Sequence, residues 1–176
     1  MRRTWGVVPI CSFAMGLATT PVLVAGAIGC EEPCAQTDTV VQVWIPEVTA
    51  AAGSRVSVRV RLDLGTPDLA LAGAAGILRF EPAFLTYEGV APFAEGPEPR
   101  VDPTLAAAGI VSFEVGREPP APPLERGTIL ELWFRVVGSP GVRADVLVEM
   151  RELIVRPGGM DVLAGATIRG GAVHIH

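Results

Sequence analysis

The residues of this chain that could do chemistry are few, and the two histidines are the most suggestive of them. His174 and His176 lie two positions apart, so in a strand both imidazoles would project from one face and could ligate a metal. Any Ser-His-Asp or Cys-His arrangement would also need one of them as its base. An exposed terminal strand is the simpler interpretation, and we expect no metal site.

The charged residues exclude several classes of enzyme. All 14 basic residues are arginine, so the chain lacks the lysine that a Walker loop or a Schiff-base enzyme requires. The carboxylate pairs Glu31–Glu32 and Glu149–Glu152 fall on a tether or a strand with no evident cleft, whereas glycoside hydrolysis needs two opposed carboxyls. We therefore expect neither enzymatic activity nor a cofactor.

Length and net charge bound the architecture and the partners. The chain has 176 residues, and removal of an N-terminal targeting segment would leave about 140, the size of one domain. The formal net charge is −5, without the cation-rich composition that nucleic-acid recognition requires. We expect one domain and no nucleic-acid partner.

The N-terminus predicts export. Two arginines near the start are followed by an uncharged run that extends to Gly29, which indicates a secretory signal over residues 1–29. The run ends in Ala-Ile-Gly-Cys and resembles the bacterial lipoprotein box, although Ala27 replaces the usual Leu. That resemblance implies lipidation of Cys30 and a lipoprotein held at the cell envelope by its acyl chains. Residues 30–39 would then form a short polar tether.

Two other N-terminal arrangements stay open. Cleavage after Ala27 would leave Cys30 and Cys34 free to form a small disulfide loop in a secreted or periplasmic protein. Alternatively, the apolar run approaches spanning length and could remain as an uncleaved anchor. A metal site from the two cysteines alone is not expected, because two ligands do not complete a tetrahedral shell.

The mature chain, residues 40–176, has the pattern of an all-β domain. Apolar residues recur with a period near two between turn residues, which predicts a single antiparallel β-sandwich of about eight or nine strands. Two proline-rich segments, 91–103 and 116–123, are expected to be a surface loop and a stiff crossover. The expected strands are 40–45, 56–62, 76–80, 85–90, 109–115, 129–136, 146–151 and 171–176.

One corner of this pattern resembles a known family. A strand ends in Phe80-Glu81-Pro82, and Leu85 opens the next strand; later come a Gly-started strand over 127–136 and a closing Gly-Ala-Val strand. This order resembles the cohesin domains over about 40–175. The resemblance implies a jelly-roll sandwich related to some carbohydrate-binding modules, which binds a calcium-dependent dockerin through one sheet. The calcium would belong to the dockerin-bearing protein, because this chain contains no calcium-loop motif.

The same resemblance implies a binding face. It would be formed by outward residues of three strands, a mixed apolar and charged set that suits a protein interface. The alternative is that these are ordinary surface residues whose charges pair across strands. The residues are Ile77, Arg79, Ile110, Ser112, Glu114, Leu147, Glu149 and Arg151.

Trp133 suggests a second function. It is predicted to lie on a sheet surface with Arg59 and Arg61, where an indole could stack on a sugar ring as in a carbohydrate-binding module of a polysaccharide-degrading system. The structural alternative is an arginine stacked on the indole. The chain lacks the aromatic row typical of sugar-binding strips, so carbohydrate binding ranks second, ahead of a structural envelope protein without a dedicated ligand.

Mass spectrometry of the mature N-terminus tests the predicted anchor. We expect a chain that begins at Cys30 and carries acyl groups, because the lipoprotein box directs cleavage immediately before the modified cysteine. An unmodified N-terminus at Ile28 would contradict lipidation and favour the disulfide alternative.

Overall fold

The computed structural model describes residues 40–92, 99–116 and 124–176. The predicted signal, Cys30, the tether and most of the proline-rich crossover lie outside these residues. No helix within the described ranges is long and apolar enough to cross a membrane.

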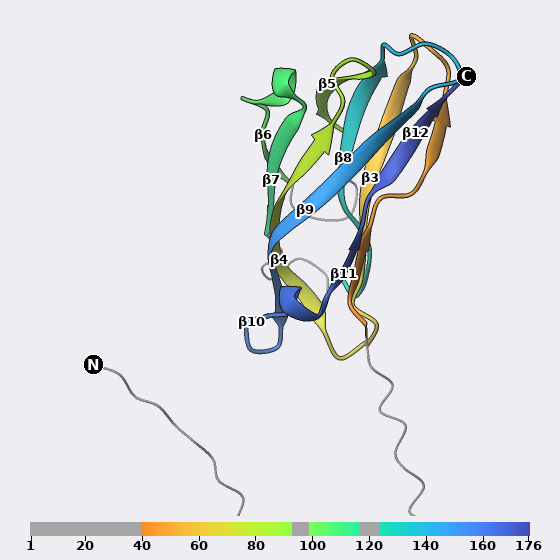
Figure 1. Ribbon diagram of the computed structural model, residues 1–176. Coiled ribbons are helices and arrows are strands. Elements are labelled where there is room, and N and C mark those ends of the chain that lie inside the picture. Colours follow the sequence, from red (N-terminus) through yellow and green to blue (C-terminus); the bar gives the residue numbers. More distant parts are fainter. Residues whose placement is uncertain (1–39, 93–98, 117–123) are drawn as a thin grey trace, which may run out of the picture. The chain divides into compact units, whose positions relative to one another are not determined.

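Two β-sheets form the domain (Figure 1). Sheet A has the strand order β11-β1-β3-β8-β5, and sheet B has the order β2-β12-β9-β4-β7-β6, with β10 paired to β9. The strands of sheet A are β1 Gln42–Trp44, β3 Arg55–Asp63, β5 Leu85–Val90, β8 Arg126–Val136 and β11 Thr167–Arg169. Those of sheet B are β2 Val48–Ala50, β4 Ala70–Phe80, β6 Arg100–Asp102, β7 Ile110–Gly116, β9 Arg143–Arg156, β10 Met160–Asp161 and β12 Gly171–Ile175. Two short 3-10 helices complete the elements, η1 Ala106–Ala108 and η2 Leu163–Gly165.

The predicted all-β sandwich is confirmed, with two differences in detail. The described residues form twelve strands, and the additional ones, β2, β6, β10 and β11, have only two or three residues each. Such strands are too short to display an apolar period, which is why β6 lies inside a segment predicted to be a loop. In addition, β1 pairs with β11 and β2 with β12 in parallel, so the sheets are mixed.

The core lies between the inner faces of the two sheets. In β3 every second residue is buried, from Val56 to Leu62, while arginines alternate with them on the outer side. Phe80 of β4 and Phe134 of β8 join the sheets, with their ring centroids 4.9 Å apart in an edge-to-face arrangement. Such aromatic pairs contribute about 0.5–1.5 kcal/mol beyond the burial of their area.

A β-bulge in sheet B shifts the register of β9. Ala75 of β4 pairs with Glu152, but the next residue, Gly76, pairs with Met150. Arg151 is therefore the extra residue, and both Met150 and Leu153 face the core on either side of it. As a result, two consecutive charged side chains, Arg151 and Glu152, are exposed in the middle of the strand.

The corner after β4 depends on a close backbone approach. The carbonyl of Glu81 accepts hydrogen bonds from the amides of Phe84 and Leu85, which closes the turn into β5. The carbonyl of Gly109 accepts a hydrogen bond from the amide of Phe80, and Gly109 has φ of 78°. A Cβ on Gly109 would lie 2.1 Å from the carbonyl oxygen of Phe80.

Substitution of Gly109 by alanine should therefore destabilise the domain strongly. The left-handed backbone and the collision with a rigid carbonyl together should cost about 2–5 kcal/mol of unfolding free energy. Gly53→Ala is the matched control, because Gly53 has φ of 76° but open space around its Cα; it should lose only about 1 kcal/mol. Equal losses in urea unfolding would contradict this account of the corner.

Candidate functional site

The eight residues predicted to meet a partner lie on one surface. Strands β9, β4 and β7 are neighbours in sheet B, and their outward side chains form rows across the sheet. Ser112, Ile77 and Glu149 form one row, and a second row joins Arg79 to its neighbours on β7 and β9. We call this outer surface the B face; its residues are Ile77, Arg79, Ile110, Ser112, Glu114, Leu147, Glu149 and Arg151.

Ile77 differs from expectation in its exposure. It is absent from the core cluster, so it faces outward, but it is only 4% exposed. Ile77 is flanked on both sides by strands, and the Arg79–Glu149 ion pair lies beside it. Little of the Ile77 side chain is therefore accessible in the free domain, and its contact with a partner stays a prediction. The accessible apolar residue of the B face is Leu147, which is 51% exposed.

An ion pair occupies the centre of the B face. Nε of Arg79 lies 2.6 Å from Oε1 of Glu149, and Nη2 lies 3.5 Å from Oε2. The hydrogen bond and the charge of Glu149 raise the pKa of Arg79. This pair fixes the orientation of two long side chains, and it separates two hollows on the same surface.

The first hollow, of about 210 Å³, lies where β6 approaches β7 and β4. Asp102 at its rim accepts hydrogen bonds from the amide and the hydroxyl of Thr104, which lower the pKa of Asp102. The second hollow, of about 310 Å³, lies on the other side of the ion pair. The first is lined by Ala75, Gly76, Arg100, Asp102, Ser112, Phe113, Glu114 and Arg151, and the second by Arg79, Phe80, Glu81, Asp145 and Leu147.

The outer side of sheet A, which we call the A face, has a different character. Its three carboxylates are each held by arginine: Glu88 by Arg55 and Arg135, Glu131 by Arg59, and Asp63 by Arg126. Both described tryptophans lie there, on β1 and β8.

An arginine stacks on the indole of Trp133, as the structural alternative to sugar binding predicted. The guanidinium carbon of Arg55 lies 4.6 Å from the centroid of its ring. Arg59 and Arg61, which the sequence predicts on the same surface, have other contacts: Arg59 pairs with Glu131, and the guanidinium carbon of Arg61 lies 5.7 Å from the centroid of the Trp44 ring. A sugar could stack on this side of Trp133 only after displacement of Arg55.

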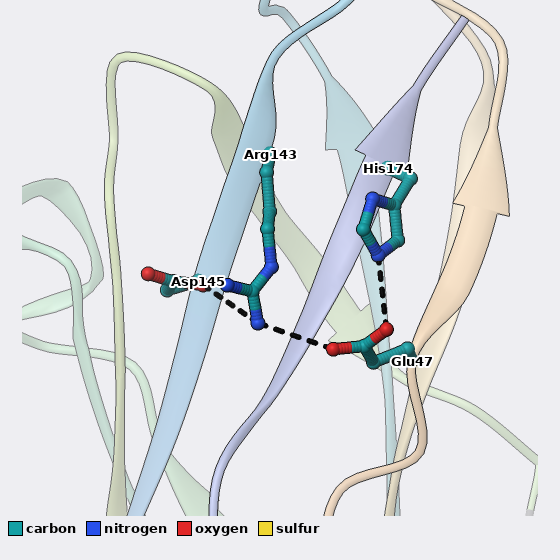
Figure 2. A network of polar contacts seen from close by, with 4 residues as sticks. All are labelled: Glu47, Arg143, Asp145 and His174. Carbon is teal, nitrogen blue, oxygen red and sulfur yellow. Dashed lines mark hydrogen bonds and ion pairs between the residues drawn. The ribbon is translucent and has the colours of Figure 1, made fainter.

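His174 belongs to a polar network at one end of sheet B (Figure 2). Its Nε2 lies 3.1 Å from Oε2 of Glu47, whose other oxygen lies 3.1 Å from Nη2 of Arg143. Arg143 also approaches Asp145, at 3.5 Å. His176 is exposed and takes no part in the network. Within the described residues, no three His, Cys, Asp or Glu side chains are grouped as metal ligands would be.

The residues that the sequence analysis did not single out come from short or irregular segments. Arg100 and Asp102 lie on β6, and Glu47 precedes β2. Trp44 had a usable signal, because it alternates with buried residues of β1 and so had to face outward.

The solved structures similar to this chain include cohesins, although no protein-family model and no curated protein matches the sequence. The sixth cohesin of scaffoldin B from Acetivibrio cellulolyticus, solved with a Cel5 dockerin, has a TM-score of 0.66 at 17% identity, over 78% of this chain and 100% of its own. The cohesin of the OlpA–Doc918 complex from Clostridium thermocellum has a TM-score of 0.64 at 12% identity, and the match covers 78% of this chain and 99% of that cohesin. A non-cellulosomal cohesin from the archaeon Archaeoglobus fulgidus has a TM-score of 0.51 at 14% identity, and the match covers 78% of this chain and 91% of that cohesin. The fold is cohesin-like, as the sequence predicted.

The network around Glu47 makes a prediction about pH. The hydrogen bond with His174 is the largest cause that lowers the pKa of Glu47, and Arg143 lowers it further. Because the pKa of Glu47 is lower in the folded than in the unfolded protein, its ionised carboxyl stabilises the folded state at pH values above the unfolded pKa. This stabilisation is lost as the pH falls through the folded pKa. In an NMR titration of the Glu47 carboxyl, His174→Ala should raise the midpoint more than Arg143→Gln does. Equal midpoints in the parent and in His174→Ala would contradict the network.

Proposed function

We propose that this cohesin-like sandwich is a non-catalytic module that binds another protein through the B face. The similar cohesins from A. cellulolyticus and C. thermocellum were solved in complexes with dockerins. The proposal is supported by the order of sheet B, in which β9, β4 and β7 are neighbours and carry on their outer side the eight residues that the family resemblance implied. A dockerin-type partner that carries its own calcium is the partner we propose.

The observation that carries this proposal is the composition of the B face. Leu147 is a half-exposed aliphatic side chain opposite Arg79 in the same row, and a hollow lies on each side of the Arg79–Glu149 pair. Arg100 and Arg151 make no ion pair within the described residues. An apolar contact with a charged surround, together with guanidinium groups that form no ion pair with another described residue, suits a protein interface.

The proposed location follows from the predicted anchor. Lipidation of Cys30 would hold the module at the cell envelope, with residues 30–39 as a spacer between the membrane and the domain. The binding surface would then capture proteins outside the cytoplasm. A role for Trp133 in stacking on neutral sugars has less support, because Arg55 covers the side of the ring that it approaches.

A capture experiment with the full-length protein tests the function. The immobilised protein should retain, from native envelope extract, a protein that carries paired calcium-binding loops, and a calcium chelator should release it. Leu147→Asp should weaken capture at least about tenfold, because it places a charge in the apolar contact.

Val137→Asp is the matched control, since Val137 is also 51% exposed but lies in the loop after β8, away from the B face. It should bind as the parent does. Calcium-independent capture would contradict a dockerin-type partner, and equal losses in the two variants would contradict the assignment of the B face.

A further inference from the structure

The low net charge of the chain conceals a basic surface. The strands of sheet A project six arginines but only three carboxylates from their outer side, so the A face carries three net positive charges although the chain as a whole has −5. At physiological ionic strength a ligand responds mainly to charges within about 8 Å. The arginines are Arg55, Arg59, Arg61, Arg126, Arg135 and Arg169; the carboxylates are Asp63, Glu88 and Glu131.

The excess positive charge is concentrated in one row across the sheet. Trp44 of β1 pairs in register with Arg61 of β3 on one side and with Arg169 of β11 on the other. Neither arginine forms an ion pair within the described residues, and both are exposed. Their main chains lie two strand spacings apart, about 10 Å. The row therefore presents a half-buried indole between two guanidinium groups, and that of Arg61 lies 5.7 Å from the centroid of the Trp44 ring.

A second indole extends this row into a strip. Trp133 is opposite Ser57, four residues before Arg61 on β3. The strand geometry places the two tryptophans about 16 Å apart, with Arg59 and Arg61 in the region between them. Each guanidinium has five N–H donors, more than one carboxylate engages, and Nε of Arg59 lies 3.0 Å from Oε1 of Glu131. Donors for an anionic ligand therefore remain along the strip.

We propose that the A face binds an anionic polysaccharide, with its acidic groups on Arg61 and Arg169 and a sugar ring against the part of Trp44 that Arg61 leaves accessible. Guanidinium groups hydrogen-bond carboxylate or sulfate oxygens in bidentate geometry. The site is separate from the B face and lies on the opposite sheet.

The spacing of charge favours such a polymer over other polyanions. Duplex DNA carries one negative charge per about 1.7 Å and favours uninterrupted cations, whereas Asp63, Glu88 and Glu131 interrupt this surface. A polysaccharide with about one charge per sugar can place its anions at the arginines and neutral atoms beside the carboxylates. An anionic membrane is less suitable, because in the described residues no exposed large aliphatic side chain projects from β3 or β8.

Equilibrium binding of the full chain to soluble polymers tests this proposal. The probes are polygalacturonate, dextran sulfate, neutral dextran, phosphatidylglycerol vesicles and a single-stranded oligonucleotide, each at low ionic strength. We expect binding to one or both acidic polysaccharides that weakens as salt is added, and no binding to dextran. The double variant Arg61→Gln/Arg169→Gln should weaken it at least about tenfold, the size expected from loss of two charge-assisted contacts. Trp44→Ala should weaken it as well.

Arg100→Gln/Arg151→Gln is the control, since it removes the same charge from sheet B; it should leave polysaccharide binding within about twofold. Circular dichroism and melting temperature establish that each variant is folded. Failure to bind either acidic polysaccharide, preference for vesicles or the oligonucleotide, or an equal loss in the control would overturn the proposal. Calcium-dependent capture through the B face is measured separately, so either function can fail without the other.

Discussion

The contact between Phe80 and Phe134 is the interaction on which both surfaces of the domain depend. It joins the central strand β4 of sheet B to β8 of sheet A, with an edge-to-face geometry at 4.9 Å between ring centroids. Because side chains alternate along a strand, burial of Phe80 directs Arg79 outward, and burial of Phe134 directs Trp133 and Arg135 outward. The core contact thus sets the register of the B face and of the A face together.

The two faces differ in how their charged side chains are paired. On the A face every carboxylate is held by an arginine, and the remaining arginines flank an indole. On the B face one ion pair lies beside Ile77, while Leu147 stays exposed at the second hollow. A surface whose charges are arranged in fixed rows suits a repetitive, flat ligand, whereas an apolar contact with open hollows suits the side chains of a folded partner. One sandwich can therefore carry two unrelated interactions.

The sequence predicted what depends on neighbours along the chain. Alternation in β3, β4 and β9 identified the inward valines and the outward Arg79, Leu147 and Glu149. Alternation could not predict the burial of Ile77, because that burial arises from strands β7 and β9, which are distant in sequence. It also missed Arg100, because a three-residue strand has no period, and it missed the positive A face, because net charge averages over both sides of a sandwich. The N-terminal predictions concern residues outside the described ranges.

The central claim is that a protein partner meets the B face and leaves the A face accessible. Hydroxyl-radical footprinting of the side chains, with and without the calcium-dependent partner, tests it most directly, because labelling reports the exposure of individual side chains. The account predicts that the partner decreases labelling of Leu147 and Ile110, while Trp44 and Trp133 are labelled as in the free protein. Protection of the tryptophans with unchanged labelling of Leu147 would contradict it.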